Sequence, residues 1–225
     1  YVRSLDDIPI AGAALQGLRG TLPVGDDTVA PKITLIRTTS WTQADQPARD
    51  LVEEVFGKLG NAGAQIRELD LPAPYPDLFD AHTIIGAVEP LSAIAWEIEN
   101  HWDDIPAPTR ELVEEGRGYG LQKYVEATAL AEACRRRLHD IIDPDEIIIT
   151  LPAPGEAPEG ISHTGSAEFN RLWTLLHVPC LHIPVDKGPK GLPLGIQLAS
   201  LRGSEASLLA AARWSAGKLA LDLFG

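Results

Sequence analysis

A strand–helix–strand pattern near the start of the chain constrains its fold more than any other feature. Residues 32–38 are rich in isoleucine and β-branched threonine, and residues 65–71 alternate apolar with polar side chains. Between them, an apolar stripe with helical spacing follows Asp45, a residue suited to cap a helix, and ends at Gly60. Strand, helix and strand joined by short links predict a βαβ unit with parallel strands and a right-handed crossover.

Three further stretches extend the predicted sheet. Residues 147–150, Ile-Ile-Ile-Thr, form a short β-branched run between prolines, which predicts a strand buried on both faces. Residues 180–185 and 194–198 flank a turn that contains Gly and Pro, so we expect them to pair as a hairpin.

Helical patterns occupy most of the remaining chain. Helices are predicted over residues 77–101, 109–115, 121–142, 166–176 and 203–219, with a weaker one before residue 20. We expect a bend at Pro90, and Leu121 and Val125 on the packed side of the long helix. No repeat, low-complexity segment or linker interrupts the pattern. The sequence therefore predicts a single α/β domain over residues 1–225.

Composition narrows the class of protein. Hydrophobic residues make up 44% of the 225 and charged residues 23%, which excludes a disordered or fibrous chain. The formal charge of −13 argues against binding to nucleic acid or to an anionic membrane surface, because both need a basic face. The run Arg135-Arg136-Arg137 is interpreted as a solvated helix face that complements the helix dipole.

Cysteine and methionine usage bear on location and completeness. Cys134 and Cys180 match neither a disulfide framework nor a common zinc spacing, so we expect no metal and a reducing, cytoplasmic location. No apolar run is long enough for a membrane helix, and a signal-peptide pattern is absent. The chain starts at Tyr1 and contains no methionine, so we interpret it as a fragment or a processed piece.

Short motifs by themselves indicate no mechanism. The sequence has no P-loop, HExxH or GxSxG motif. Residues 162–166, Ser-His-Thr-Gly-Ser, have the types needed for nucleophilic catalysis, but neighbours in sequence seldom face each other as a triad must. We interpret them as the end of a long Pro- and Gly-rich loop, 151–165, and a helix cap at Ser166.

Three segments together resemble the amidase signature family of amide hydrolases. The first comprises residues 160–165, Gly-Ile-Ser-His-Thr-Gly, and residues 169–180, Phe-Asn-Arg-Leu-Trp-Thr-Leu-Leu-His-Val-Pro-Cys. It is similar to a family segment in which a Thr-Gly pair precedes a Phe-Asn and a Trp-Thr-Leu-Leu run. Residues 191–198, Gly-Leu-Pro-Leu-Gly-Ile-Gln-Leu, resemble a strand of the family, and residues 150–158 resemble its proline-rich loop.

The resemblance extends over nearly the whole chain, because residues 2–7 and 32–41 also match in order and spacing. It implies an α/β/α sandwich around a mixed sheet, of which this chain would be the carboxy-terminal part. The family's catalytic lysine, cis-peptide serine and nucleophilic serine precede the region that residues 2–7 resemble. No Gly-Gly-Ser-Ser-Gly-Gly stretch occurs here and none of the six lysines has a matching context, so we expect no catalytic residue in this chain.

The activity implied by the resemblance is hydrolysis of a carboxamide, without metal or cofactor, by the parent protein. This chain would supply core sheet and a substrate-pocket wall, and alone it would be inactive. The alternative is a non-catalytic, truncated or degenerate paralogue that acts as a binding subunit. Expected partners are a small amide substrate and either a missing amino-terminal half or a second copy, because half a sandwich cannot cover strands 147–150 and 180–185 fully.

Three residues in the matching motif are the candidate substrate-binding residues. They are Thr164, Asn170 and Trp173. Each also has a structural interpretation: Thr164 as a cap or turn residue, Asn170 as a side chain that bonds loop backbone, and Trp173 as part of the core.

Overall fold

A mixed five-stranded sheet forms the centre of the computed structural model, which describes residues 2, 4–162 and 164–221. The strands lie in the order β2-β1-β3-β5-β4. Their bounds are β1 Lys32–Ile36, β2 Gln65–Leu69, β3 Glu146–Thr150, β4 Cys180–Lys187 and β5 Pro193–Ala199. Strands β2, β1 and β3 are parallel, whereas β5 is antiparallel to both β3 and β4. The parallel βαβ unit, the hairpin and the mixed sheet are thus confirmed.

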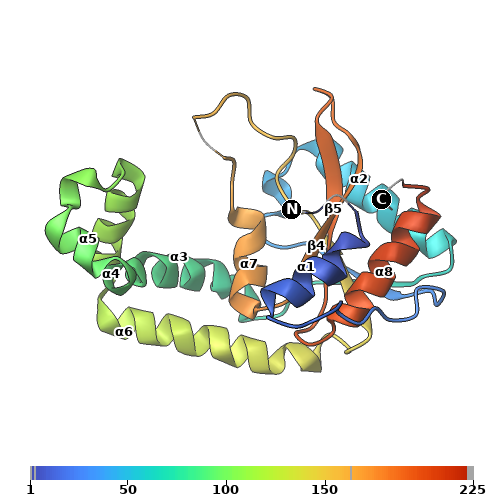
Figure 1. Cartoon of the computed structure of the whole chain (residues 1–225), viewed down its shortest axis with the longest axis horizontal. Coiled ribbons are helices and arrows are strands. Elements are labelled where there is room, and N and C mark those ends of the chain that lie inside the picture. The colour runs from blue at the N-terminus through green and yellow to red at the C-terminus, as the bar shows by residue number, and fades with distance from the viewer. Residues whose placement is uncertain (1, 3, 163, 222–225) are drawn as a thin grey trace.

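Helices cover the two faces of this sheet (Figure 1). Helices α1, α2 and α8 pack with one face, and α3, α6 and α7 with the other. The bounds are α1 Asp7–Leu15, α2 Gln46–Asn61, α3 Leu78–Val88, α6 Ala107–Arg137, α7 Glu168–Leu176 and α8 Glu205–Lys218. Two short helices, α4 Pro90–Ala93 and α5 Ala95–Asn100, extend α3 into an arm that projects from the rest of the molecule in Figure 1. No helix of the described part is long and apolar enough to cross a membrane.

Strand β3 is buried on both faces, as the sequence predicts. Ile147 and Ile149 join the core on the side of α2 and α8, whereas Ile148 joins the core on the side of α3, α6 and α7. All three side chains are at most 1% exposed. Burying one such side chain stabilises a fold by about 1.5–3 kcal/mol. The expectation that this chain cannot cover residues 147–150 is therefore wrong.

Strand β4 differs, because it lies at the edge of the sheet. Its residues Leu181 and Ile183 are buried in the core, whereas Cys180, His182 and Pro184 on the opposite face are exposed. This strand is covered on one face and open on the other within the described residues.

Two helical predictions need correction. The pattern over 77–101 is divided into α3, α4 and α5, and the two helices predicted over 109–142 meet within α6 at Gly120, whose φ of 73° breaks the helical path. Leu121 and Val125 are 77% and 55% exposed. Beyond the kink, α6 instead buries small residues, Ala127 and Ala131, because they allow its backbone to approach α3 closely.

A buried carboxylate joins three strands at the amino-terminal end of β3. Glu146 is 4% exposed and accepts hydrogen bonds from Arg67, from the Thr34 hydroxyl and from the backbone N–H of Asp143 at 3.1 Å. Burial alone would raise the pKa of Glu146, but these hydrogen bonds, with that from Arg67 the strongest, together lower it. The charged form of Glu146 therefore stabilises the fold.

Arg67→Met should lower the free energy of unfolding at pH 7 by about 2 kcal/mol, because it leaves a buried carboxylate without its cation. This value is below that for a fully buried pair, since the Arg67 side chain is 46% exposed. The Glu146 pKa is depressed in the fold, so its contribution is present above pH of about 4.3 and is lost as the pH falls through the folded-state pKa. The difference in the free energy of unfolding between Arg67→Met and the wild type should therefore become smaller in urea titrations at low pH.

Arg136→Met is the matched control, because Arg136 pairs with Glu132 at 3.4 Å while both side chains are more than half exposed. Its effect should stay within about 0.5 kcal/mol. An equal loss in the two variants would contradict the role assigned to Glu146.

Candidate functional site

The loop that follows β3 arches away from the carboxyl end of the parallel strands (Figure 1). Ligands of open α/β sheets bind at this end of the strands. The first part of the loop is held in place by two hydrogen bonds. The Asn170 side chain donates to the carbonyl oxygen of Pro152 at 3.0 Å. The backbone N–H of Asp45 donates to the carbonyl oxygen of Pro154 at 2.7 Å. The loop is thus fastened to both α7 and the start of α2.

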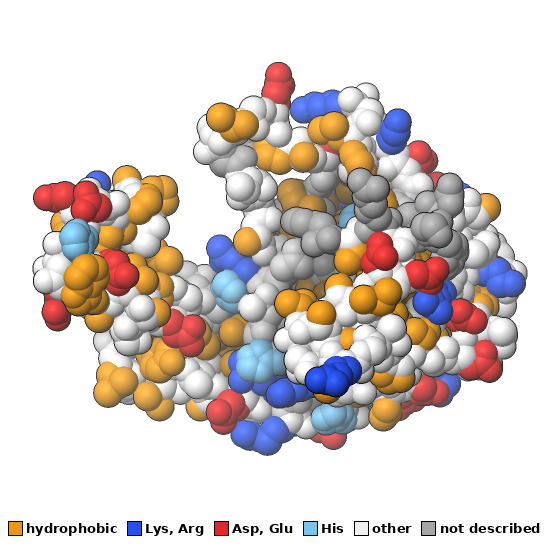
Figure 2. Space-filling view, in the orientation of Figure 1, with side chains coloured by type: hydrophobic (Ala, Val, Ile, Leu, Met, Phe, Trp, Pro, Cys, Tyr) orange, Lys and Arg blue, Asp and Glu red, His pale blue; other side chains and the backbone are white. Residues whose placement is uncertain are grey.

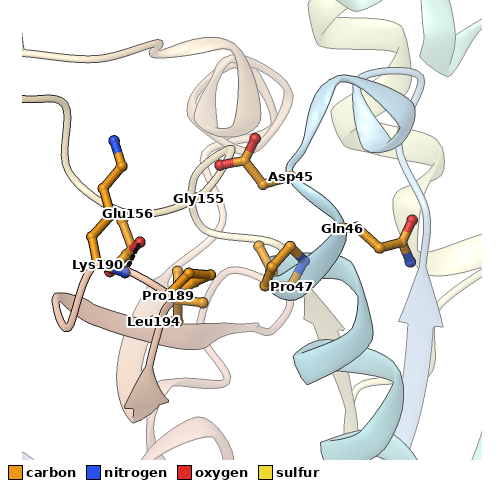
Figure 3. A pocket seen from close by; sticks show the side chains of 9 residues that line it. Asp45, Gln46, Pro47, Gly155, Glu156, Pro189, Lys190 and Leu194 are labelled. Carbon is orange, nitrogen blue, oxygen red and sulfur yellow. Dashed lines mark hydrogen bonds between the residues drawn. The ribbon is translucent and has the colours of Figure 1, made fainter.

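Glu156 fastens the same loop to the turn between β4 and β5 (Figure 3). Its carboxylate accepts the backbone N–H of Lys190 at 3.0 Å and that of Leu192 at 2.7 Å. Hydrogen bonds from backbone N–H groups to a carboxylate are stronger than those between neutral groups. A pocket of about 260 Å³ lies between this turn, the loop and the start of α2, with Asp45, Glu156 and Lys190 among its lining residues.

Gly155 lets the loop pass close to the Asp45 side chain at the start of α2. A Cβ atom built on it would lie 2.2 Å from Oδ2 of Asp45, so any side chain would displace either the loop or that carboxylate. Asp45 precedes α2 as predicted, but its side chain makes no capping hydrogen bond. Its carboxylate lies against Gly155 instead.

A second polar cluster fixes the start of α7. Glu168 pairs with Arg171 at 3.1 Å and accepts a hydrogen bond from the buried hydroxyl of Ser40 at 3.3 Å. Arg171 also donates to the Thr83 hydroxyl of α3 at 3.2 Å. Burial and then the positive charge of Arg171 lower the pKa of the nearby His82, so its ring is neutral at pH 7. Glu168 is shared between Ser40 and Arg171, and Arg171 also reaches Thr83, so the cluster positions α7 against α3.

The three predicted substrate-binding residues do not converge on one point. Thr164 is exposed in the loop, next to His163, which lies outside the described residues. Asn170 is half-buried and holds the loop through Pro152, as its structural interpretation proposed. Trp173 is 2% exposed within the core on the side of α3 and α6. A role for any of them in substrate binding stays a prediction.

The predicted cap at Ser166 is nearly correct. Helix α7 begins at Glu168, and the Ser166 hydroxyl accepts the backbone N–H of Glu168 at 3.2 Å. This use of Ser166 agrees with a structural interpretation of residues 162–166.

Within the described ranges, no hydrogen bond joins a lysine to a serine hydroxyl. Lys32 and Lys58 pair with carboxylates, and Lys123 and Lys218 lie over aromatic rings. The same residues contain no cluster of His, Cys, Asp and Glu that could hold a metal ion. The loop after β3, the start of α2 and the turn between β4 and β5 together shape a binding surface.

Sequence reasoning missed Glu156 and the Ser40–Glu168–Arg171 cluster. Glu156 is surrounded by prolines and glycines, which indicate a loop. They do not indicate that its carboxylate binds a turn 34 residues further along the chain. The length of the loop and the resemblance of residues 150–158 to the family's proline-rich loop drew attention to the segment, but neither indicated a role for Glu156.

Trp173→Ala should lower the free energy of unfolding by about 3–5 kcal/mol, because it removes the largest fully buried side chain. The indole N–H has no hydrogen-bond partner among the described residues, so Trp173→Phe, which keeps a ring, should cost only about 1–2 kcal/mol. Trp96→Ala is the control, since Trp96 is 62% exposed, and it should change stability by no more than about 0.5 kcal/mol. A loss below about 1 kcal/mol for Trp173→Ala in thermal and chemical unfolding would contradict a core role.

Comparisons with known proteins agree with this geometry. No family model matches the chain. Human fatty-acid amide hydrolase 2 is 28% identical over 133 residues, which are 57% of this chain and 25% of that protein. A crystal structure of an amidase superimposes with a TM-score of 0.79 at 21% identity over 96% of this chain. A bacterial aryl acylamidase of the amidase signature family superimposes with a TM-score of 0.64 at 16% identity over 84% of this chain.

The chain spans only part of these proteins. It covers 51% of the amidase and 44% of the aryl acylamidase, and the matched segment is a quarter of the human relative. The likeness to the solved structures concerns the fold, a mixed sheet between helical layers. These findings confirm the resemblance seen in the motifs: the chain is similar to the amidase signature family in sequence and shares the fold of its enzymes.

Proposed function

We propose that this chain is the carboxy-terminal part of an amide hydrolase and forms one wall of its substrate site. The observation that supports this most directly is the position of the family-like motif. Residues 169–180 form α7 and the start of β4, and Asn170 of this motif holds the proline-rich loop that also resembles the family. Two of the three segments that carry the sequence resemblance are therefore in direct contact.

The chain's proposed contribution is shape and position. The loop leaves the carboxyl end of β3 and is fastened at Pro152, Pro154 and Glu156. The segment around Thr164 extends beyond these fastenings and is exposed, so it is the part we assign to substrate contact. We assign positioning roles to the other two candidates: Asn170 holds this loop, and Trp173 holds α7 in the core.

The nucleophile is proposed to come from outside these 225 residues. In amide hydrolysis of this class, an activated serine attacks the carbonyl carbon while backbone N–H groups stabilise the oxyanion. The described serines and lysines form no such unit. Ser40 donates to a carboxylate already engaged by Arg171, and Ser166 lies at the start of α7.

The purified chain should neither hydrolyse amides nor react with a fluorophosphonate probe, which labels activated serines. A full-length serine amidase assayed in parallel serves as the positive control, with aliphatic amides and anilides as substrates. Turnover or labelling that Ser162→Ala or Ser166→Ala abolishes would contradict the proposal that the nucleophile lies elsewhere.

The alternative, a non-catalytic binding subunit, predicts the same inactivity. The DNA upstream of the first codon separates the two. A reading frame that continues into a Gly- and Ser-rich segment favours the hydrolase, whereas a start codon nearby favours the subunit.

Both functions require a surface that contacts another protein chain. We propose that this surface is the open face of β4. The edge of β2 carries the charged side chains of Arg67 and Glu68, which discourage pairing with another strand. Residues 180–185 of β4 contain no Lys, Arg, Asp or Glu, and Cys180, His182 and Pro184 are exposed. The Nε2 of the buried Gln197 on the neighbouring strand has no hydrogen-bond partner among the described residues.

The isolated chain should therefore associate in sedimentation velocity experiments at micromolar concentration. His182→Asp places a charge on the open face and should shift the distribution toward the 24.2 kDa monomer. Ile66→Asp on β2 adds a charge to the already charged edge and should leave it unchanged. A monodisperse wild-type monomer would count against this surface.

A further inference from the structure

A pocket of about 270 Å³ lies where α6 and α7 end, beside the segment that follows β5. Figure 2 shows basic and histidine side chains gathered at the lower centre of the molecule, where these helices end in Figure 1. Leu176 and Leu201 contribute apolar surface to the pocket. Its basic lining residues are Arg135, Arg136, His139, His177 and Arg202.

This positive charge is unusual for a chain whose formal charge is −13. Among the described residues, no Asp or Glu lines the pocket. Outside the lining, Glu132 lies 3.4 Å from Arg136, but both side chains are largely exposed. Exposed pairs of this kind contribute little and neutralise the pocket poorly.

Two of the lining side chains have no polar partner among the described residues. In the portion of the chain that the structure describes, neither Arg202 nor the ring of His177 takes part in a hydrogen bond or ion pair. Arg135 uses its Nε to donate to the carbonyl oxygen of Leu175 at 2.5 Å, which leaves the two terminal nitrogens of its guanidinium. Burial, and then the positive charges of Arg135 and Arg202, lower the pKa of His177.

Helix dipoles explain only part of this arrangement. Cations are favoured near the carboxyl end of a helix, which accounts for Arg135 at the last turn of α6 and its bond to the end of α7. Arg202 lies on neither helix, because it follows β5 in the chain. Its convergence with Arg135 on His177 brings like charges together, and nothing in the helix ends requires that.

We propose that this pocket binds a small phosphorylated compound, whose phosphate group is held by Arg135, Arg202 and His177. The planar guanidinium presents donors in a fork that matches phosphate oxygens. The carbon part of the ligand packs against Leu176 and Leu201. The volume of about 270 Å³ lies just below the usual range for drug-sized ligands, which favours a small molecule. The proposal is independent of the amidase role.

The test uses inorganic pyrophosphate as the probe, with the full chain at constant ionic strength. Isothermal titration calorimetry should give saturable binding with one site per chain, and the Tm should rise with pyrophosphate concentration. Potassium chloride at the same ionic strength should produce neither effect. Absence of saturable binding would overturn the proposal.

Variants distinguish this pocket from general charge attraction. Arg202→Gln should weaken binding on the order of tenfold. Arg202→Lys keeps the charge but loses the forked donors of the guanidinium. Its affinity for pyrophosphate should therefore lie between those of the wild type and of Arg202→Gln. Arg19→Gln is the matched control, since Arg19 is another exposed arginine and lies after α1, and it should bind as the wild type does. Equal losses in Arg202→Gln and Arg19→Gln would overturn the site, with circular dichroism verifying that each variant folds.

A single-stranded DNA of twenty nucleotides provides the second arm. It carries many phosphates and would exploit an extended basic surface, whereas a pocket of about 270 Å³ favours a small compound. Tighter binding of this DNA than of pyrophosphate at physiological salt would overturn the small-molecule assignment.

Discussion

The burial of β3 between two layers of helices is the constraint on which the other features depend. Its three isoleucines point alternately to the two cores, so each face of the sheet receives part of the same short strand. The Thr150 hydroxyl at its end donates to the carbonyl oxygen of Ile36 at 2.9 Å, which aligns the ends of β3 and β1. At the other end, Glu146 joins β3 to β1 and β2. A central strand held at both ends and on both faces provides a rigid base for the loops.

The loop after β3 is held in place by elements that pack on this base. Its fastenings come from α2, α7 and the turn between β4 and β5, which are far apart in sequence. The bonds involve backbone groups at one or both ends, so they specify the path of the loop more than its composition. Loops that carry function on a rigid scaffold are commonly held in this way. The exposed part around Thr164 can then vary without disturbing the sheet.

Charge is handled in two different ways in this acidic protein. Around Glu146, each charge has a partner and the carboxylate is fully engaged, which is how buried charges are tolerated. In the pocket at the ends of α6 and α7, basic side chains converge, and none of the described lining residues is acidic. This contrast is the reason for proposing a ligand at the second arrangement, because the bond of Arg135 to Leu175 accounts for only part of it.

The local pattern of the sequence by itself determined the elements: the βαβ unit, the buried run at 147–150, the hairpin and the helix after Ser166. Period and turn residues are local properties, so they can be read without knowing what packs where. The family motifs determined the type of fold for the same reason, since residues 169–180 and 191–198 are continuous segments.

Only the tertiary structure decided which side of each element is buried and which polar groups meet. Leu121 and Val125 have the spacing of a packed face, yet α6 turns its small residues toward α3, because close approach of two helices favours alanine over leucine. Trp173 was open to either a pocket or a core position, and its burial depends on α3 and α6. The hold of Glu156 on Lys190 and Leu192, and the convergence of Arg135, His177 and Arg202, join residues tens of positions apart. Such contacts arise from the packing of whole elements, which no local pattern encodes.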